Sequence, residues 1–200
     1  EHVLKDILSI NQTAEPRPSL LTWMLRGLVL VIAYFLSAKL GLTFSTVATN
    51  VTLLWPPTGL ALAALLVFGV RLWPAVFLAA LAANLTTGIP LGAAFGIAVG
   101  NCLEAVAGYY LLRAVGFQVD LQRVRDVVAL VVLAAGVSTM FSATVGALTL
   151  VSFTIIPWDR FGYVWITWWM GDAMGNLVFA PLLLAWKGAS KLRCDMRHIA

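Results

Sequence analysis

Long apolar runs separated by short polar breaks make up most of the chain. There are six such runs, at residues 23–42, 47–70, 72–85, 91–112, 127–151 and 163–186. A helix that crosses the hydrocarbon core of a bilayer needs about 20 predominantly apolar residues. The pattern therefore predicts an all-α polytopic membrane protein, a bundle of about six transmembrane helices with short or broken second and third helices.

The second and third runs contain helices that are too short to cross a bilayer alone. Residues 57–70 and 72–85 supply 14 residues each, or about 21 Å at 1.5 Å per residue, against about 30 Å of hydrocarbon. The tripeptide Leu-Trp-Pro stands at the start of both, and proline is well tolerated in the first helical turn. We therefore expect one short helix from near Pro57 and a second from Pro74 to Asn84.

Residues 45–55 must then complete the first of these crossings without a regular helix. Lipid cannot satisfy free backbone N–H and C=O groups, so such backbone is tolerated at membrane depth only where protein or a water-filled cavity surrounds it. We expect the segment at this helix start to line a ligand-binding cavity, with the candidate residues Trp55, Pro56, Pro57, Thr58 and Gly59. The alternative is a loop at the membrane surface.

Composition supports a membrane protein and excludes other classes. Of the 200 residues, 61% are hydrophobic and 11% are charged, and the mean hydropathy is +0.93, which leaves too few polar side chains to cover a water-facing surface. The net charge of +4 is spread over short loops, so we expect no nucleic-acid partner. Cys102 and Cys194 form no motif, and we expect no metal and no cofactor.

The distribution of basic residues predicts the topology. With a cytoplasmic N-terminus, eleven Lys and Arg residues fall inside and two, Lys39 and Arg160, fall outside, which is a strong positive-inside bias. Trp158, Trp165 and Trp168 would then mark the outer interface. We divide the chain into a cytoplasmic N-terminal segment (1–20), a transmembrane sensor domain (21–187) and a basic cytoplasmic loop or linker (188–200).

Two of the apolar runs carry polar side chains in their interiors. Asn101 and Glu104 are spaced i and i+3, and Asp172 and Asn176 are spaced i and i+4, so each pair shares a helix face. Counting at 1.5 Å per residue places Asn101 and Asp172 about 14 to 15 Å deep, and Glu104 and Asn176 about 20 Å deep. We therefore predict one shared polar cluster that binds a cation, a proton or a ligand. The alternative is that these groups only join neighbouring helices.

Small residues repeat along the same helices. Their spacing is typical of close helix packing, and we favour packing inside one bundle over a dimer face, although a homodimer stays open. The stripes are Gly92, Gly96, Gly100 and Gly108; Gly171 and Gly175; and Ser138, Ser142, Gly146 and Thr149.

Three ordered motifs give the chain a resemblance to a known family. They are WPPTG at 55–59, GNCLE at 100–104 and WWMGDAMG at 168–175, the last in a helix that contains Pro181. From about residue 42 to 184 the sequence resembles the bacterial membrane-associated sensor 1 domain, the first type of the MASE family. The resemblance implies a multi-pass sensory input domain of the bacterial inner membrane, fused in cis to a histidine kinase or a diguanylate cyclase. Because that domain is usually described with about eight helices, it also implies a fragment that lacks the last two helices and the output domain.

Three functions follow from these patterns. The first is a sensor that detects a small ligand, an ion or a membrane partner protein and regulates a cytoplasmic output in two-component or cyclic-di-GMP signalling. The second is a membrane substrate-capture or transport protein for a small solute. The third, a structural anchor, explains the buried acids least well. The chain carries no kinase, cyclase or nucleotide-loop signature, so we expect no enzyme activity from it.

Overall fold

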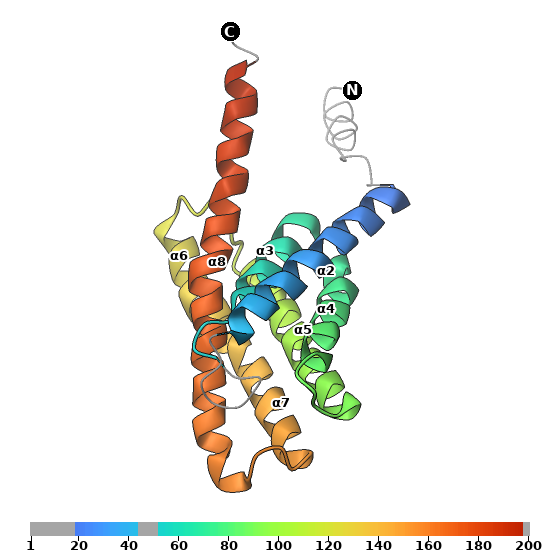
Figure 1. Ribbon diagram of the computed structural model, residues 1–200. Helices are drawn as coiled ribbons and strands as arrows, with labels where there is room; N and C mark the ends of the chain where they lie inside the picture. The colour runs from blue at the N-terminus through green and yellow to red at the C-terminus, as the bar shows by residue number, and fades with distance from the viewer. Residues whose placement is uncertain (1–18, 44–51, 198–200) are drawn as a thin grey trace, which may run out of the picture.

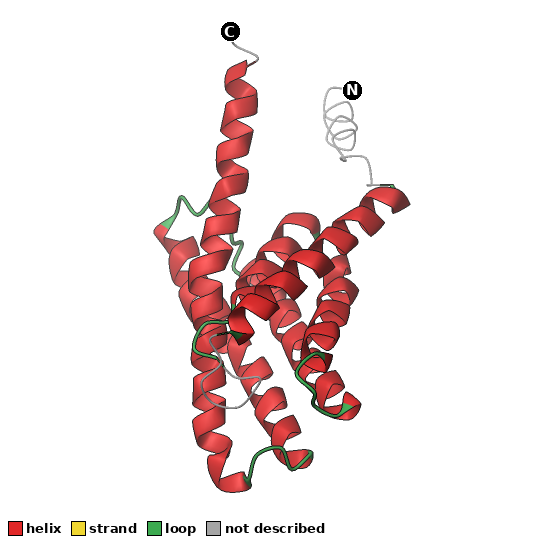
Figure 2. Cartoon of the chain, in the orientation of Figure 1, coloured by secondary structure: helices red, strands yellow, loops and turns green. Residues whose placement is uncertain are grey.

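The computed structural model describes residues 19–43 and 52–197, and its regular elements there are helices (Figure 2). The principal elements, in chain order, are α2 (Leu20–Leu42), α3 (Pro56–Phe68), α4 (Trp73–Leu85), α5 (Leu91–Ala114), α6 (Val124–Ala129), η3 (Leu130–Ser138), α7 (Thr139–Ser152) and α8 (Phe161–Arg197). Two short 3₁₀ turns, η2 (Val70–Leu72) and η4 (Trp158–Arg160), precede α4 and α8. The all-α membrane fold predicted from the hydropathy pattern is confirmed.

Within the part of the chain that the structure describes, three stretches are long and apolar enough to cross a membrane: α2, α5 and the continuous run 124–152. The helix α8 has the length as well, since 37 residues at 1.5 Å each make about 55 Å. The helices α3 and α4 have 13 residues each, or about 20 Å. The prediction of two short helices is therefore correct.

Proline sets the start of both short helices. Pro56 and Pro57 occupy the first two positions of α3, one residue before the predicted start, and Pro74 is the second residue of α4. Proline loses nothing there because the first N–H groups of a helix have no intrahelical partner. The helix α3 ends at Phe68 and is followed by Gly69, whose φ of +102° suits a residue without a Cβ. The part of the predicted crossing at 44–51 lies outside the described residues, as does most of the N-terminal segment 1–20.

The helices form one bundle with α3 near its centre (Figure 1). The helix α3 packs along α8, α5 packs against α4 and α7, and α2 crosses obliquely over α3 and α4. Most of α3 is buried, including Leu62, Leu65 and Leu66. By contrast α2 exposes a row of large apolar side chains such as Leu25, Leu28 and Leu36, as a lipid-facing helix does.

Basic side chains lie at both ends of the bundle. The start of α2 and the end of α8 lie at one end (Figure 1), and the Arg26 guanidinium there lies 5.0 Å from the Phe68 ring centroid, next to the turn that carries Arg71. At the opposite end Lys39 Nζ donates a 3.1 Å hydrogen bond to Thr86 Oγ1. Lys39 thus lies at the other end of the bundle from Arg26 and Arg71, and the membrane orientation stays a prediction.

The fifth crossing contains a feature that the sequence pattern did not predict. Residues 130–138 form the π-helix η3 between α6 and α7. A π-helix leaves carbonyl groups displaced from the α-helical ladder, and such segments are often found at functional sites. Here α8 supplies donors, because Trp169 Nε1 donates to Gly136 O at 2.9 Å and Asn176 Nδ2 donates to Ala134 O at 3.2 Å.

The last helix is longer than predicted. The apolar run ended at residue 186, but α8 continues as a helix to Arg197. The segment that we expected to be a basic loop or linker is therefore helical over 188–197. One rod runs from the bundle interior to well beyond it (Figure 1).

Candidate functional site

The WPPTG segment lies directly against α8. Trp55 N donates a 3.0 Å hydrogen bond to Gly171 O. A Cβ added to Gly171 would overlap the Thr52 carbonyl, and one added to Gly175 would overlap the Trp55 carbonyl. The small residues of α8 therefore allow a direct backbone approach, and this approach places the first turn of α3 next to the polar face of α8.

The first turn of α3 bonds to the buried acid of α8. Thr58 Oγ1 donates to Asp172 Oδ1 at 3.0 Å. The side chain of Asp172 is only 1% exposed. Its second oxygen, Oδ2, has no hydrogen-bond partner in the structure. A buried carboxyl oxygen without a donor is costly, so this atom is the first sign of a binding function.

Glu104 and Asn176 form the deeper half of the cluster. Asn176 Nδ2 lies 3.5 Å from Glu104 Oε1, at the limit of a hydrogen bond, and also donates to the π-helical carbonyl of Ala134. Both side chains are almost completely buried, and Asn176 Oδ1 has no partner. Asn176 therefore connects the acid of α5 to η3.

Asn101 joins the cluster through α7. Ser142 Oγ donates to Asn101 Oδ1 at 2.9 Å and accepts a 3.1 Å bond from Trp168 Nε1. The Ser142 hydroxyl also neighbours both acids. A single serine on the small-residue stripe of α7 thus lies between the polar faces of α5 and α8.

The two carboxyl groups are direct neighbours. Glu104 and Asp172 lie within hydrogen-bonding reach of each other, and Tyr34 of α2 lies within electrostatic reach of both. No Lys or Arg of the described residues is among the groups that act on either acid. The pair is therefore an acid cluster without a cationic partner in that part of the chain.

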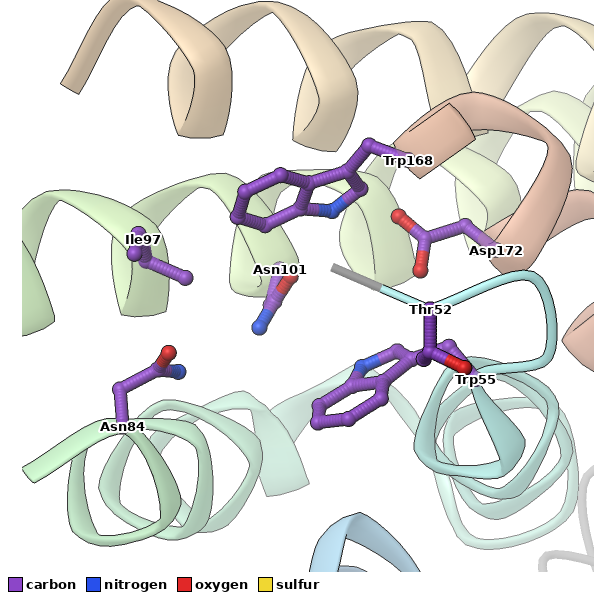
Figure 3. Close-up of a pocket in the computed structure, with 7 residues that line it drawn as sticks. All are labelled: Thr52, Trp55, Asn84, Ile97, Asn101, Trp168 and Asp172. Atoms are coloured by element: carbon purple, nitrogen blue, oxygen red, sulfur yellow. The ribbon is translucent and has the colours of Figure 1, made fainter. Parts of the chain in front are cut away.

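A small polar cavity lies beside Asp172 (Figure 3). Two tryptophan rings flank it, and the Asn84 and Asn101 side chains point toward it from α4 and α5. Its volume of about 10 Å³ is roughly that needed for one water molecule. The lining residues are Thr52, Trp55, Asn84, Ile97, Asn101, Trp168 and Asp172.

The predicted candidates divide into two groups. The structure joins Asn101, Glu104, Asp172 and Asn176 into one connected cluster, with Thr58 bonded to it and Trp55 on the cavity wall. The buried Pro56, Pro57 and Gly59 instead pack: Pro56 lies against Gly41, and Gly59 against the Gly175 carbonyl. A binding role for any of these residues stays a prediction.

Several residues at the site were not candidates from the sequence. Trp168, expected at the outer interface, is buried, because Gly146 of α7 leaves a space that its ring fills. Its position one turn before Asp172 on the same helix face was the available signal. Ser142 was on the predicted small-residue stripe, whereas Asn84 and Thr52 gave no signal beyond their polarity.

The small-residue stripes pack within the bundle, as predicted. On α5, Gly92 faces Phe153, Gly96 faces Thr149 and Gly100 faces Val145. These contacts bring α5 close to α7 and hold Asn101 and Glu104 beside Ser142. Within the described residues no group of three His, Cys, Asp or Glu side chains is placed to hold a metal ion.

One comparison with known proteins gives a match. The family model MASE1 matches residues 26–200, which is most of the chain. No curated protein and no solved structure matches the sequence.

Proposed function

The chain belongs to the MASE1 family of membrane-associated sensory domains, and we propose that it detects a small ligand, an ion or a partner protein and regulates a fused cytoplasmic output. The output that we propose is a histidine kinase or a diguanylate cyclase of a bacterial signalling system. The chain itself is then a non-catalytic input domain of the bacterial inner membrane. Its N-terminus is cytoplasmic in this proposal, which places the end that carries Arg26 and Arg71 inside.

The observation that carries this proposal is that α8 connects the buried cluster with the end of the bundle. This helix contributes Asp172 and Asn176 to the buried cluster and continues as one helix, with Pro181 in its interior, to Arg197. In this proposal, a change in the cluster that rotates or shifts α8 is carried along the helix, past Pro181, toward Arg197. Small displacements of packed helices are a common form of signalling transition.

The π-helix supplies a second element that can change state. Asn176 bonds to Ala134 O of η3 while it contacts Glu104. A ligand that draws Asn176 or Glu104 away removes a donor from the displaced carbonyl and favours a different winding of residues 130–138. The stimulus then selects between two arrangements of the same helices.

A transport function has less support. A capture or transport protein needs an internal space for its solute, and the cavity at the cluster has the volume of about one water molecule. We therefore place the sensor first.

The test uses the protein in its natural reading frame, with its output activity measured in membranes. Glu104→Gln and Asp172→Asn keep the size of each side chain and remove its charge. We expect each to fix the output in one state, high or low, at unchanged protein level. Asp159→Asn, at an exposed acid of η4, is the matched control and should behave like the wild type. Wild-type output in both buried-acid variants would reject the proposal.

A further inference from the structure

We propose that Glu104 and Asp172 share one exchangeable proton, and that this proton is the ligand whose binding the cluster reports. The second half of the proposal rests on the proposed sensory function. The first half concerns only the described residues of this chain.

The count of donors and acceptors is the first argument. Thr58 donates to one oxygen of Asp172, Asn176 donates to one oxygen of Glu104, and Ser142 has already given its proton to Asn101. Asp172 Oδ2 has no partner in the structure. A protonated carboxyl is a donor, whereas two carboxylates only accept. One proton between the neighbouring carboxyl groups supplies the missing donor.

The charges that face the pair give the second argument. Tyr34 of α2 interacts electrostatically with both acids, and Cys102 of α5 interacts with Tyr34. A phenol and a thiol carry either no charge or a negative charge. The helices α3, α4 and α7 and the segment η3 contain no ionisable side chain among their described residues, and offer only hydroxyl and amide groups. Two carboxylates in contact inside a membrane bundle repel each other and lack solvation. One bound proton halves this charge.

The size of the cavity gives the third argument and points to the class of ligand. A space of about 10 Å³ admits about one water molecule and excludes an organic solute. Its polar lining leads from Asp172 past Asn101 to Asn84 (Figure 3). Asn84 is in the last turn of α4, at the end of the bundle that holds Lys39 and Thr86. A single water in this space would connect Asp172 toward that end, which is the outer side in the proposed orientation.

Loss of the proton has a defined structural consequence. It places two negative charges on adjacent faces of α5 and α8 and so favours separation of these helices. Asn176 links Glu104 to the Ala134 carbonyl of η3, so the same separation disturbs the π-helix. Protonation and the arrangement of α8 are therefore linked.

The test is infrared spectroscopy on the purified chain in lipid nanodiscs. Near neutral pH, solvent-exposed Asp and Glu are ionised, so the C=O stretching band of a protonated carboxylic acid reports a buried one. We expect such a band in the wild type, a shift of the band in D₂O, and its loss or displacement in both Glu104→Gln and Asp172→Asn. Asp159→Asn should keep the wild-type band. Circular dichroism checks that each variant is folded.

Three results would overturn the proposal. The first is no protonated-acid band in the wild type down to about pH 6, above the range in which exposed carboxyls titrate. The second is a band that neither buried-acid variant changes. The third is removal of the band when sodium replaces choline at constant pH, which would identify a cation site.

This experiment does not depend on an output domain, so it separates the two proposals. If the infrared band is present but the variants leave the output unchanged, the shared proton is supported and the sensory role of the cluster is rejected. If the variants change the output but no band is present, the sensory role is supported and the shared proton is rejected.

Discussion

The Thr58 hydroxyl donates a 3.0 Å hydrogen bond to Asp172 Oδ1, across 114 residues of sequence. This bond joins the proline-rich start of α3 to the acid of α8, and so connects two of the three sequence motifs. It also gives Asp172 its one donor of fixed geometry. The start of α3 at Pro56 and Pro57 thus places the Thr58 hydroxyl next to Asp172 inside the bundle.

Removal of this donor should destabilise the bundle. Thr58→Val keeps the shape of the side chain but leaves Asp172 Oδ1 without its partner, and an unsatisfied buried acceptor costs about 1–3 kcal/mol. We expect a lower melting temperature in detergent, measured by circular dichroism. Thr58→Ser keeps the hydroxyl and should lie closer to the wild type. Equal melting temperatures for the Val and Ser variants would contradict a role for this bond.

The backbone of α8 lies so close to the segment before α3 that no side chain should be tolerated at Gly175. In Gly175→Ala the new Cβ meets the Trp55 carbonyl, a backbone atom that cannot move aside alone, and overpacking costs about 1–3 kcal/mol or more. We expect a clear loss of thermal stability or of folded protein. Gly162→Ala is the control on the same helix, where a Cβ meets nothing within 4 Å. It should be neutral or slightly stabilising because alanine favours the helix. Similar stability of the two variants would refute the contact.

Local sequence patterns predicted part of the fold and part of the candidate site. The prolines at 56, 57 and 74 predicted two helix starts because their effect on the first turn does not depend on tertiary structure. Counting residues from the helix ends predicted the layers of the cluster, because the helical rise is constant. Asn176 does contact Glu104, and Asp172 and Asn101 do line one cavity.

The remaining features depend on packing that no local pattern records. Trp168 is buried because Gly146, on another helix, leaves room for its ring. The π-helix η3 accepts hydrogen bonds from Trp169 and Asn176 of α8, so its winding is supported from outside its own sequence. The small volume of the cavity results from two tryptophan rings that close on it from different elements.

The π-helix should loosen when its donor from α8 is removed. Asn176→Ala leaves the Ala134 carbonyl without its bond from α8, a loss of about 1 kcal/mol, or roughly fivefold in a local opening equilibrium. Hydrogen–deuterium exchange should therefore be faster by about this factor in peptides that cover 130–138. Thr167→Val removes the bond from Thr167 to the Tyr163 carbonyl within α8 itself and should leave these peptides unchanged. Unaltered exchange in Asn176→Ala would mean that η3 keeps its winding without α8.

The continuous course of α8 predicts a dependence of signalling on helical phase. With 3.6 residues per turn, two alanines inserted after Trp186 rotate everything that follows by about 200°, whereas seven change the direction by only about 20°. If α8 acts as a rigid connector through Arg197, the two-residue insertion should change the output of the full-length protein, and the seven-residue insertion should restore wild-type regulation at a greater length. The measurement is output activity in membranes, compared at equal protein levels. The output would not depend on the angle of rotation if the connection were flexible. Equal effects of the two insertions on the output would therefore show that rotation of α8 does not carry the signal.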